Sequence, residues 1–344
     1  MNTKLNEDAF DFLGIAKFHK NGYTGKNITI ASKESIIEGV FDDVECDGYF
    51  EYNSTNKQAK HGTTVMDYIR QVVPDARKIA CDFSGITEKN VWKCEGMEKL
   101  LSNPPQVFTS SSYNTSDSQE HHMKKYKELR GKGCFLVHGA GNDSEDGVLN
   151  VVKNDVFKAV AAYKLFCGKP KKESFSSVGE EVDFASLDNL RATWDNKRHT
   201  GTSFSAPIFA GMVGLVQDFF ISKTGKQLEY ENLLQFIKDN CIDVDEEGKD
   251  DKSGFGLFIL PDPNSINISK YTDVKGENKN MSEENKNTNT NTYKTLEDVP
   301  NWGKPTIEKL INKKALRGDE NGDLNISNDL LRTLVIHDRL GLYN

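Results

Sequence analysis

Residues 199–215 constrain the fold more than any other stretch, because they place one serine between a glycine turn and an apolar run of helical length. Gly201 can adopt backbone angles closed to other residues, and Thr202 and Ser203 stand where a helix usually begins. The unpaired N–H groups of a first helical turn can face a negative charge. Ser203 is therefore a candidate nucleophile, and a plain helix cap is the alternative interpretation of the same residues.

Several further motifs fit the same chemistry. The chain carries H-G-T-T-V at 61–65, F-L-V-H-G-A-G-N at 135–142, S-F-S-S-V-G at 174–179, G-T-S-F-S-A-P-I-F-A-G at 201–211 and G-F-G at 254–256. In residues and in order they resemble the motifs of the subtilisin-like serine proteases (subtilases), over roughly residues 12–262. The resemblance implies that His61 is a base at the start of a helix, that Asn142 donates to an oxyanion and that 174–179 is a strand.

The acid position departs from the family pattern. The family's usual D-[ST]-G does not occur before the histidine motif. The run G-Y-T-G-K-N-I-T-I-A at 22–31 is similar to the family's first strand and places Glu34 at the acid position. Glutamate extends about 1 Å farther than aspartate, but any ionised carboxylate within hydrogen-bond reach can orient the histidine. A slip of two residues would put Ser32 there instead, and Asp42 and Asp43 are further candidates.

The mechanism implied is acyl transfer to Ser203, with His61 as base, Glu34 as orienting acid and Asn142 in the oxyanion hole. In the family an extended peptide adds as a strand beside the segment that resembles 107–113, and a bulky ring here replaces the usual small glycine. A serine-rich loop is the alternative interpretation of that segment. The substrate-binding candidates are Ser111, Ser112, Tyr113, Gly139 and Ala140.

Composition restricts the classes of partner. The formal net charge of −8 and the lack of a sustained basic run argue against nucleic acid. We find no apolar stretch approaching the roughly 20 residues that span a bilayer, and no apolar signal core at the N-terminus. The sequence therefore predicts cytoplasmic localisation, with release to the cell wall on lysis. The six scattered cysteines suggest neither a disulfide framework nor a zinc site, and we expect no metal and no cofactor.

Hydrophobic patterning predicts an α/β fold: a doubly wound, mostly parallel sheet with helices on both faces, plus a small α-helical C-terminal module. The predicted strands are 28–31, 77–83, 106–109, 134–138 and 156–162. The predicted helices are 61–73, 90–101, 118–130, 205–223 and 228–240. The predicted domains are a peptidase domain at 1–263, a flexible Asn/Lys/Thr-rich linker at 264–294 and the module at 295–344.

The C-terminal module has its own apolar pattern, formed by Trp302, Ile307, Leu310, Leu316, Leu330, Leu331 and Leu334. It resembles the small module behind catalytic domains in phage lysins and other clostridial cell-wall enzymes. That resemblance implies binding to the cell wall or to a second copy, and an origin in a Firmicute or its prophage. Asp319, Asn321 and Asp323 imitate the start of a calcium loop, but no acid stands at the twelfth place, so they predict a polar turn.

Two functions remain open at this point. The first is an active serine endopeptidase acting on a protein or peptide substrate. The second is a pseudoprotease of the same fold, which keeps Ser203 but has lost its acid and acts as a binding or regulatory protein. Whether Glu34 contacts His61 discriminates between them.

Overall fold

A computed structural model describes residues 5–48, 56–82, 95–111, 120–144, 147–272, 292–300, 303–319, 322–339 and 343. The chain divides into two compact units, Met1–Lys275 and Gly276–Asn344, and each is described by itself. Ser112 and Tyr113 of the predicted substrate site, and Trp302 and Asn321 of the predicted module, lie outside the described residues.

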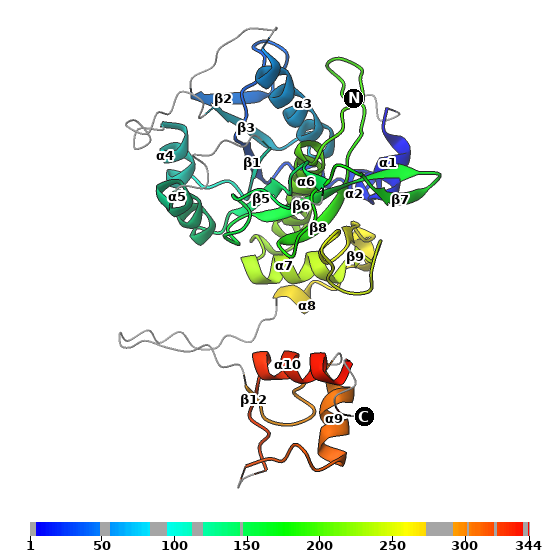
Figure 1. The fold of residues 1–344 in the computed structure, drawn as a ribbon. Coiled ribbons are helices and arrows are strands. Elements are labelled where there is room, and N and C mark those ends of the chain that lie inside the picture. The colour runs from blue at the N-terminus through cyan, green and yellow to red at the C-terminus, as the bar shows by residue number, and fades with distance from the viewer. Residues whose placement is uncertain are drawn as a thin grey trace. The chain divides into compact units, whose positions relative to one another are not determined.

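The first unit is built on a ten-stranded sheet in the order β2-β3-β1-β4-β5-β6-β8-β10-β9, with β7 paired to β6 (Figure 1). Neighbouring strands from β2 to β10 run parallel. Strand β9 pairs antiparallel with β10, and β7 pairs antiparallel with β6. The strands are β1 Thr29–Ser32, β2 Val44–Gly48, β3 Arg77–Asp82, β4 Val107–Ser110, β5 Phe135–Gly139, β6 Lys158–Phe166, β7 Lys169–Lys172, β8 Val182–Leu187, β9 Cys241–Ile242 and β10 Leu257–Phe258. The predicted α/β class is confirmed, and the strand order reverses beside β1, where such sheets place their sites.

Helices flank this sheet (Figure 1). They are α1 Glu7–Phe12, α2 Ile15–Lys20, α3 Lys57–Val72, α4 Glu95–Ser102, α5 Glu120–Gly131, α6 Thr202–Thr224, α7 Tyr230–Asp239 and α8 Ser269–Thr272. Helix α3 begins four residues before His61, because the side chain of Asn56 accepts hydrogen bonds from the N–H groups of Gln58 and Ala59. The predicted place of His61 in a first helical turn is thus wrong by one turn.

Two other local predictions are wrong. Residues 174–179 form a turn, and the strand that precedes Ser203 is β8, which the sequence pattern did not indicate. Helix α6 begins at Thr202, three residues before the predicted start at residue 205, and Pro207 is its sixth residue. Gly201, at φ 145°, caps this helix in a conformation that L side chains rarely adopt.

Helix α6 also corrects the expectation about apolar runs. It is the one helix among the described residues with the length and composition to cross a membrane, with a mean hydropathy of 1.5. In this structure 94% of that window is buried inside the first unit. Helix α6 is thus the central core helix, which explains why it is apolar all round.

Helices α3 and α6 approach each other closely at a glycine. A Cβ on Gly211 would lie 2.8 Å from both Cβ and Cγ1 of Val72. Any side chain at Gly211 would therefore force the two helices apart.

The first unit continues beyond the predicted domain end at residue 263. After the short turn Pro263–Ser265, helix α8 packs Tyr271 against Phe236, with ring centroids 5.0 Å apart, and the Tyr271 hydroxyl donates to Asp239 at 2.9 Å. Ile266 and Ile268 also pack on this core. The first part of the predicted linker is therefore folded, because these three apolar side chains can be buried.

The second unit pairs α9 (Lys304–Asn312) and α10 (Asn328–Arg339) with a two-stranded antiparallel sheet, β11 (Thr292–Tyr293) and β12 (Ile326–Ser327). Its buried core comprises Val299, Ile307, Ile326, Leu331 and Val335. The purely helical prediction missed the sheet, and Leu330 is 43% exposed rather than buried. Asp319 fits the predicted polar turn, since its carboxylate accepts from the Asp323 N–H and from the Asn325 amide.

Candidate active site

Glu34 and His61 are in contact. Nδ1 of His61 lies 3.2 Å from Oε2 of Glu34, whose side chain is 2% exposed. Burial is the largest influence on the His61 pKa and lowers it, but the attraction and hydrogen bond from Glu34 together outweigh burial and raise this pKa above its usual value. The contact holds the imidazole with Nδ1 toward the acid, which leaves Nε2 for a reacting group.

The other candidates for the acid position make no such contact with His61 in the described residues. Ser32 is buried in β1, and its hydroxyl has no hydrogen-bond partner in the described residues. Asp43 instead pairs with Arg70 at 2.6 Å and with Lys78 at 3.4 Å, which lowers the pKa of Asp43 against the opposing effect of burial. Asp42 is exposed, and no hydrogen bond to His61 is recorded for it among the described residues.

Ser203 is the second residue of α6 and lies close to this pair. The ring of Phe204, the next residue, packs on the ring of His61 with centroids 5.3 Å apart. The Ser203 hydroxyl donates to the carbonyl oxygen of Ser111 at 3.2 Å rather than to His61. The N–H of Ser111 in turn donates to Glu34 Oε1 at 3.0 Å, so the backbone of Ser111 contacts both Glu34 and Ser203.

Asn142 lies beside the start of α6 with a fixed amide orientation. Its Oδ1 accepts from the Thr202 N–H at 2.9 Å and from the Thr202 hydroxyl at 3.2 Å, which leaves the Asn142 NH₂ group as a donor. The Phe204 N–H is taken by the Gly201 carbonyl, while the Ser203 N–H has no recorded acceptor in the described part of the chain. Two donors next to Ser203 are therefore available to an oxyanion.

Gly139 and Ala140 support this arrangement. A Cβ on Gly139 would lie 2.8 Å from the Thr202 hydroxyl and 2.9 Å from its backbone, so the close approach of β5 to α6 requires glycine. Ala140 follows on β5 and is fully buried. The structure thus places Gly139 against the start of the helix that carries Ser203.

The predicted substrate strand is wrong for residues 107–110 and stays a prediction for 111–113. Both edges of 107–110 are paired, to β1 on one side and to β5 on the other, so no peptide can pair with that segment. Ser111, the first residue past β4, is 8% exposed and already uses its N–H and carbonyl in the contacts to Glu34 and Ser203.

Asp188 is a site residue that sequence reasoning missed. It follows β8 and is 3% exposed; its Oδ2 accepts from the Gly201 N–H at 2.9 Å, and its Oδ1 has no partner in the described residues. Burial raises the pKa of Asp188 to about 7, against the hydrogen bond from Gly201. A lone aspartate in an S-L-D-N run gives no signal of this contact, because only the fold brings Asp188 under Gly201.

Within the described residues, no group of three or more His, Cys, Asp or Glu side chains is arranged to hold a metal ion.

No family model matches the chain. It is similar to Thermostable alkaline protease of Halalkalibacterium halodurans, 28% identical over 138 residues, covering 39% of this chain and 37% of that protein. It is also similar to Subtilisin NAT of Bacillus subtilis subsp. natto, 26% identical over 220 residues, covering 58% of this chain and 57% of that protein. The matched regions thus span little more than half of these relatives at most.

Among solved structures, the PatG macrocyclase in complex with peptide superposes with a TM-score of 0.58 and 14% identity. The match covers 73% of this chain and 94% of that chain. Because the identity is only 14%, this match supports a similarity of fold alone. Together with the curated relatives, it shows that the first unit has a subtilisin-like fold and supports a relationship to the subtilisin-like serine proteases at the level of the family.

Proposed function

We propose that the first unit is a serine endopeptidase that cleaves peptide bonds through a Ser203 acyl-enzyme. The observation that carries the proposal is the contact between Glu34 and His61 at 3.2 Å, close to Ser203 at the start of α6. A pseudoprotease that had lost its acid would have no reason to keep a buried carboxylate on the histidine.

Each residue has one step in the proposed reaction. The Ser203 hydroxyl turns from the Ser111 carbonyl to Nε2 of His61 and loses its proton as it attacks the substrate carbonyl. Glu34 stabilises the resulting imidazolium. The Asn142 amide and the Ser203 N–H hold the oxyanion while His61 passes its proton to the departing amine. Water, deprotonated by His61, then attacks the acyl group, and the proton returns to the Ser203 oxygen as the acid product leaves.

The substrate in this proposal is an extended peptide, and one solved structure of similar fold, the PatG macrocyclase, is a complex with peptide. The Ser111 carbonyl becomes available once the Ser203 hydroxyl leaves it, and it can then accept a hydrogen bond from the substrate backbone. Binding and activation of the serine are thereby coupled at one carbonyl oxygen.

A fluorophosphonate probe tests this function directly, because it reacts with an activated serine and with no resting hydroxyl. We expect the wild-type protein to be labelled on Ser203 and to digest casein, and we expect Ser203→Ala and His61→Ala to lose both. Losses of about 10⁵-fold to 10⁶-fold in turnover are expected, and the double variant should be no worse than either single variant. A folded wild-type protein that neither labels nor cleaves would establish the pseudoprotease instead.

For the second unit we propose attachment to a Gram-positive cell wall or to a second copy of the chain. Its separate core supports a role apart from catalysis, since it encloses its own apolar residues. Attachment would raise the local concentration of the peptidase without changing its chemistry.

A further inference from the structure

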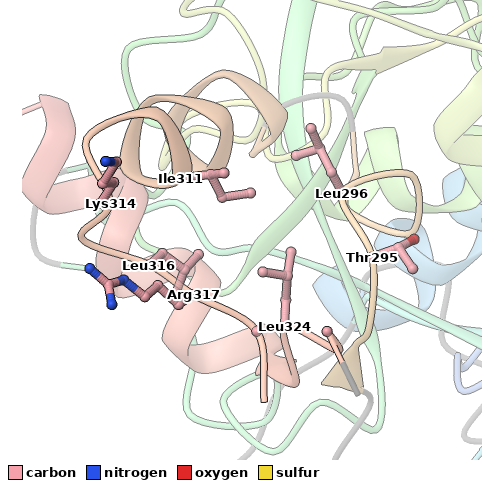
Figure 2. A pocket seen from close by; sticks show the side chains of 9 residues that line it. Thr295, Leu296, Ile311, Lys314, Leu316, Arg317 and Leu324 are labelled. Carbon is pink, nitrogen blue, oxygen red and sulfur yellow. The ribbon is translucent and has the colours of Figure 1, made fainter. Parts of the chain in front are cut away.

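The second unit contains a cavity of about 430 Å³ between α9 and the turn that precedes β12 (Figure 2). Four half-buried aliphatic side chains form its wall: Leu296, Ile311, Leu316 and Leu324. Its volume lies within the range of about 300–1,000 Å³ typical of ligand pockets. The cavity is thus large enough and apolar enough to receive a small ligand.

Two cations line one side of the cavity, Lys314 and Arg317 (Figure 2). Neither forms an ion pair with an acidic residue in the described part of the chain. Four described carboxylates flank the lining residues in the sequence: Glu297, Asp298, Asp319 and Asp323. Three of them bond other residues, Asp298 with Thr295, Asp319 with Asn325 and Asp323 with Lys294, and Glu297 is exposed. None of these four carboxylates therefore pairs with the positive charge at this edge.

Lys314 is also in an unusual conformation for its residue type. Its φ is +59°, its N–H donates to the Ile311 carbonyl, and the Ala315 N–H donates to the Leu310 carbonyl. These two bonds form the Schellman motif that ends α9, and the left-handed position of that motif usually holds glycine or asparagine. A lysine there stabilises the fold less than glycine would, which suggests that its charge is retained for a ligand.

We propose that this cavity binds a short peptide that carries a carboxylate beside an aliphatic side chain. The aliphatic group would lie against Ile311, Leu316 and Leu324, and the carboxylate would pair with Lys314 and Arg317. The inference rests on the attachment role proposed above and gives it a ligand chemistry. An aliphatic wall without cations would favour a neutral ligand, and cations without such a wall would favour any anion.

The test is calorimetric titration of the full-length Ser203→Ala protein, which avoids cleavage of the probe and makes the result independent of peptidase activity. The probes are acetyl-Leu-Ala with a free carboxylate, the same dipeptide as its amide, and decanoate. We expect the free acid to bind at least five-fold more tightly than the amide. Arg317→Gln and Lys314→Gly should each weaken binding of the free acid at least five-fold, and Lys314→Arg should retain it. The control Lys304→Gln, at the opposite end of α9, should leave the affinity unchanged.

Lys314→Gly offers a second readout that separates binding from folding. Because glycine suits the left-handed position, this variant should raise the midpoint of thermal unfolding of the second unit while it weakens binding of the free-acid dipeptide. Equal affinity for acid and amide, or no binding of either, would overturn the proposal. Tight binding of decanoate without the peptide acid would also overturn it, because the ligand would then be an anionic amphiphile.

Discussion

Glu34 accepts the backbone N–H of Ser111 at 3.0 Å through one carboxylate oxygen while the other oxygen contacts His61. The hydrogen bond from Ser111 restrains the Glu34 side chain, which is one methylene longer than the aspartate of the related motif. The carboxylate therefore reaches Nδ1 of His61 in a defined orientation, and the N–H of Ser111 stabilises its charge.

Replacement of Glu34 should change both the rate and its pH dependence. Glu34→Gln removes the charge that raises the pKa of His61, so burial then lowers this pKa and the acid limb of the kcat/KM profile moves to lower pH. The maximal kcat should fall about 10⁴-fold, because the amide no longer stabilises imidazolium. Glu34→Asp should keep measurable activity. An unchanged rate and profile in Glu34→Gln would remove Glu34 from the mechanism.

Gly139→Ala should damage the site through the position of α6. The added methyl would lie 2.8 Å from the Thr202 hydroxyl, so the helix start and Asn142 must move. We expect a loss of about 10²-fold in kcat and roughly 1–3 kcal/mol in the free energy of unfolding. Gly131→Ala is the matched control, because nothing lies within 4 Å of its added Cβ. Equal turnover of both variants would contradict this account of the β5–α6 contact.

Asp188 should make the stability of the first unit fall as pH rises. Its pKa is raised from 3.8 to about 7 by burial, so the folded protein holds a proton that the unfolded chain has lost. Relative to Asp188→Asn, the wild type should lose on the order of a few kcal/mol between about pH 4 and pH 7. Urea unfolding of both proteins at pH 5 and pH 8 measures this. If the free energy of unfolding changes equally in the two proteins between pH 5 and pH 8, Asp188 has the same pKa in the folded and unfolded states.

The length of chain after β10 should matter for stability and not for chemistry. A protein ending at residue 275 keeps Tyr271 on Phe236, so its melting temperature and its turnover of a small peptide should match the full chain. A protein ending at residue 262 loses Tyr271, Ile266 and Ile268 from the core, and its free energy of unfolding should fall by roughly 3–5 kcal/mol. Identical melting temperatures of the two truncated proteins would show that α8 does not stabilise the unit.

The sequence predicted the parts of the fold that depend on local chemistry. Buried strands such as β5 and β6 contain short apolar runs, and the glycine and serine at 201–203 mark a helix start by their conformational preferences. Glu34 could be placed because a long motif set its register. Its contact with Ser111 could not be predicted, since it joins residues 77 positions apart through a backbone N–H.

Other features could not be predicted because only packing decides them. Asp188 has no local signal, and its pKa depends on burial beneath Gly201. Helix α8 lies in a stretch that is polar on average, and three apolar side chains are enough to fold it. The membrane-like composition of α6 has the same origin, because a helix surrounded by protein needs no polar face.

The contact between Gly211 and Val72 has a consequence for how this molecule can change. His61 and Ser203 stand on two helices whose separation is set by that contact, several turns inside the core. The spacing of the reacting pair is thus anchored in the interior, whereas the shape of a substrate cleft is determined at the surface. Insertions and substitutions in surface loops can therefore change selectivity without changing the spacing of His61 and Ser203. Conversely, one buried methyl group at residue 211 would lower activity toward every substrate.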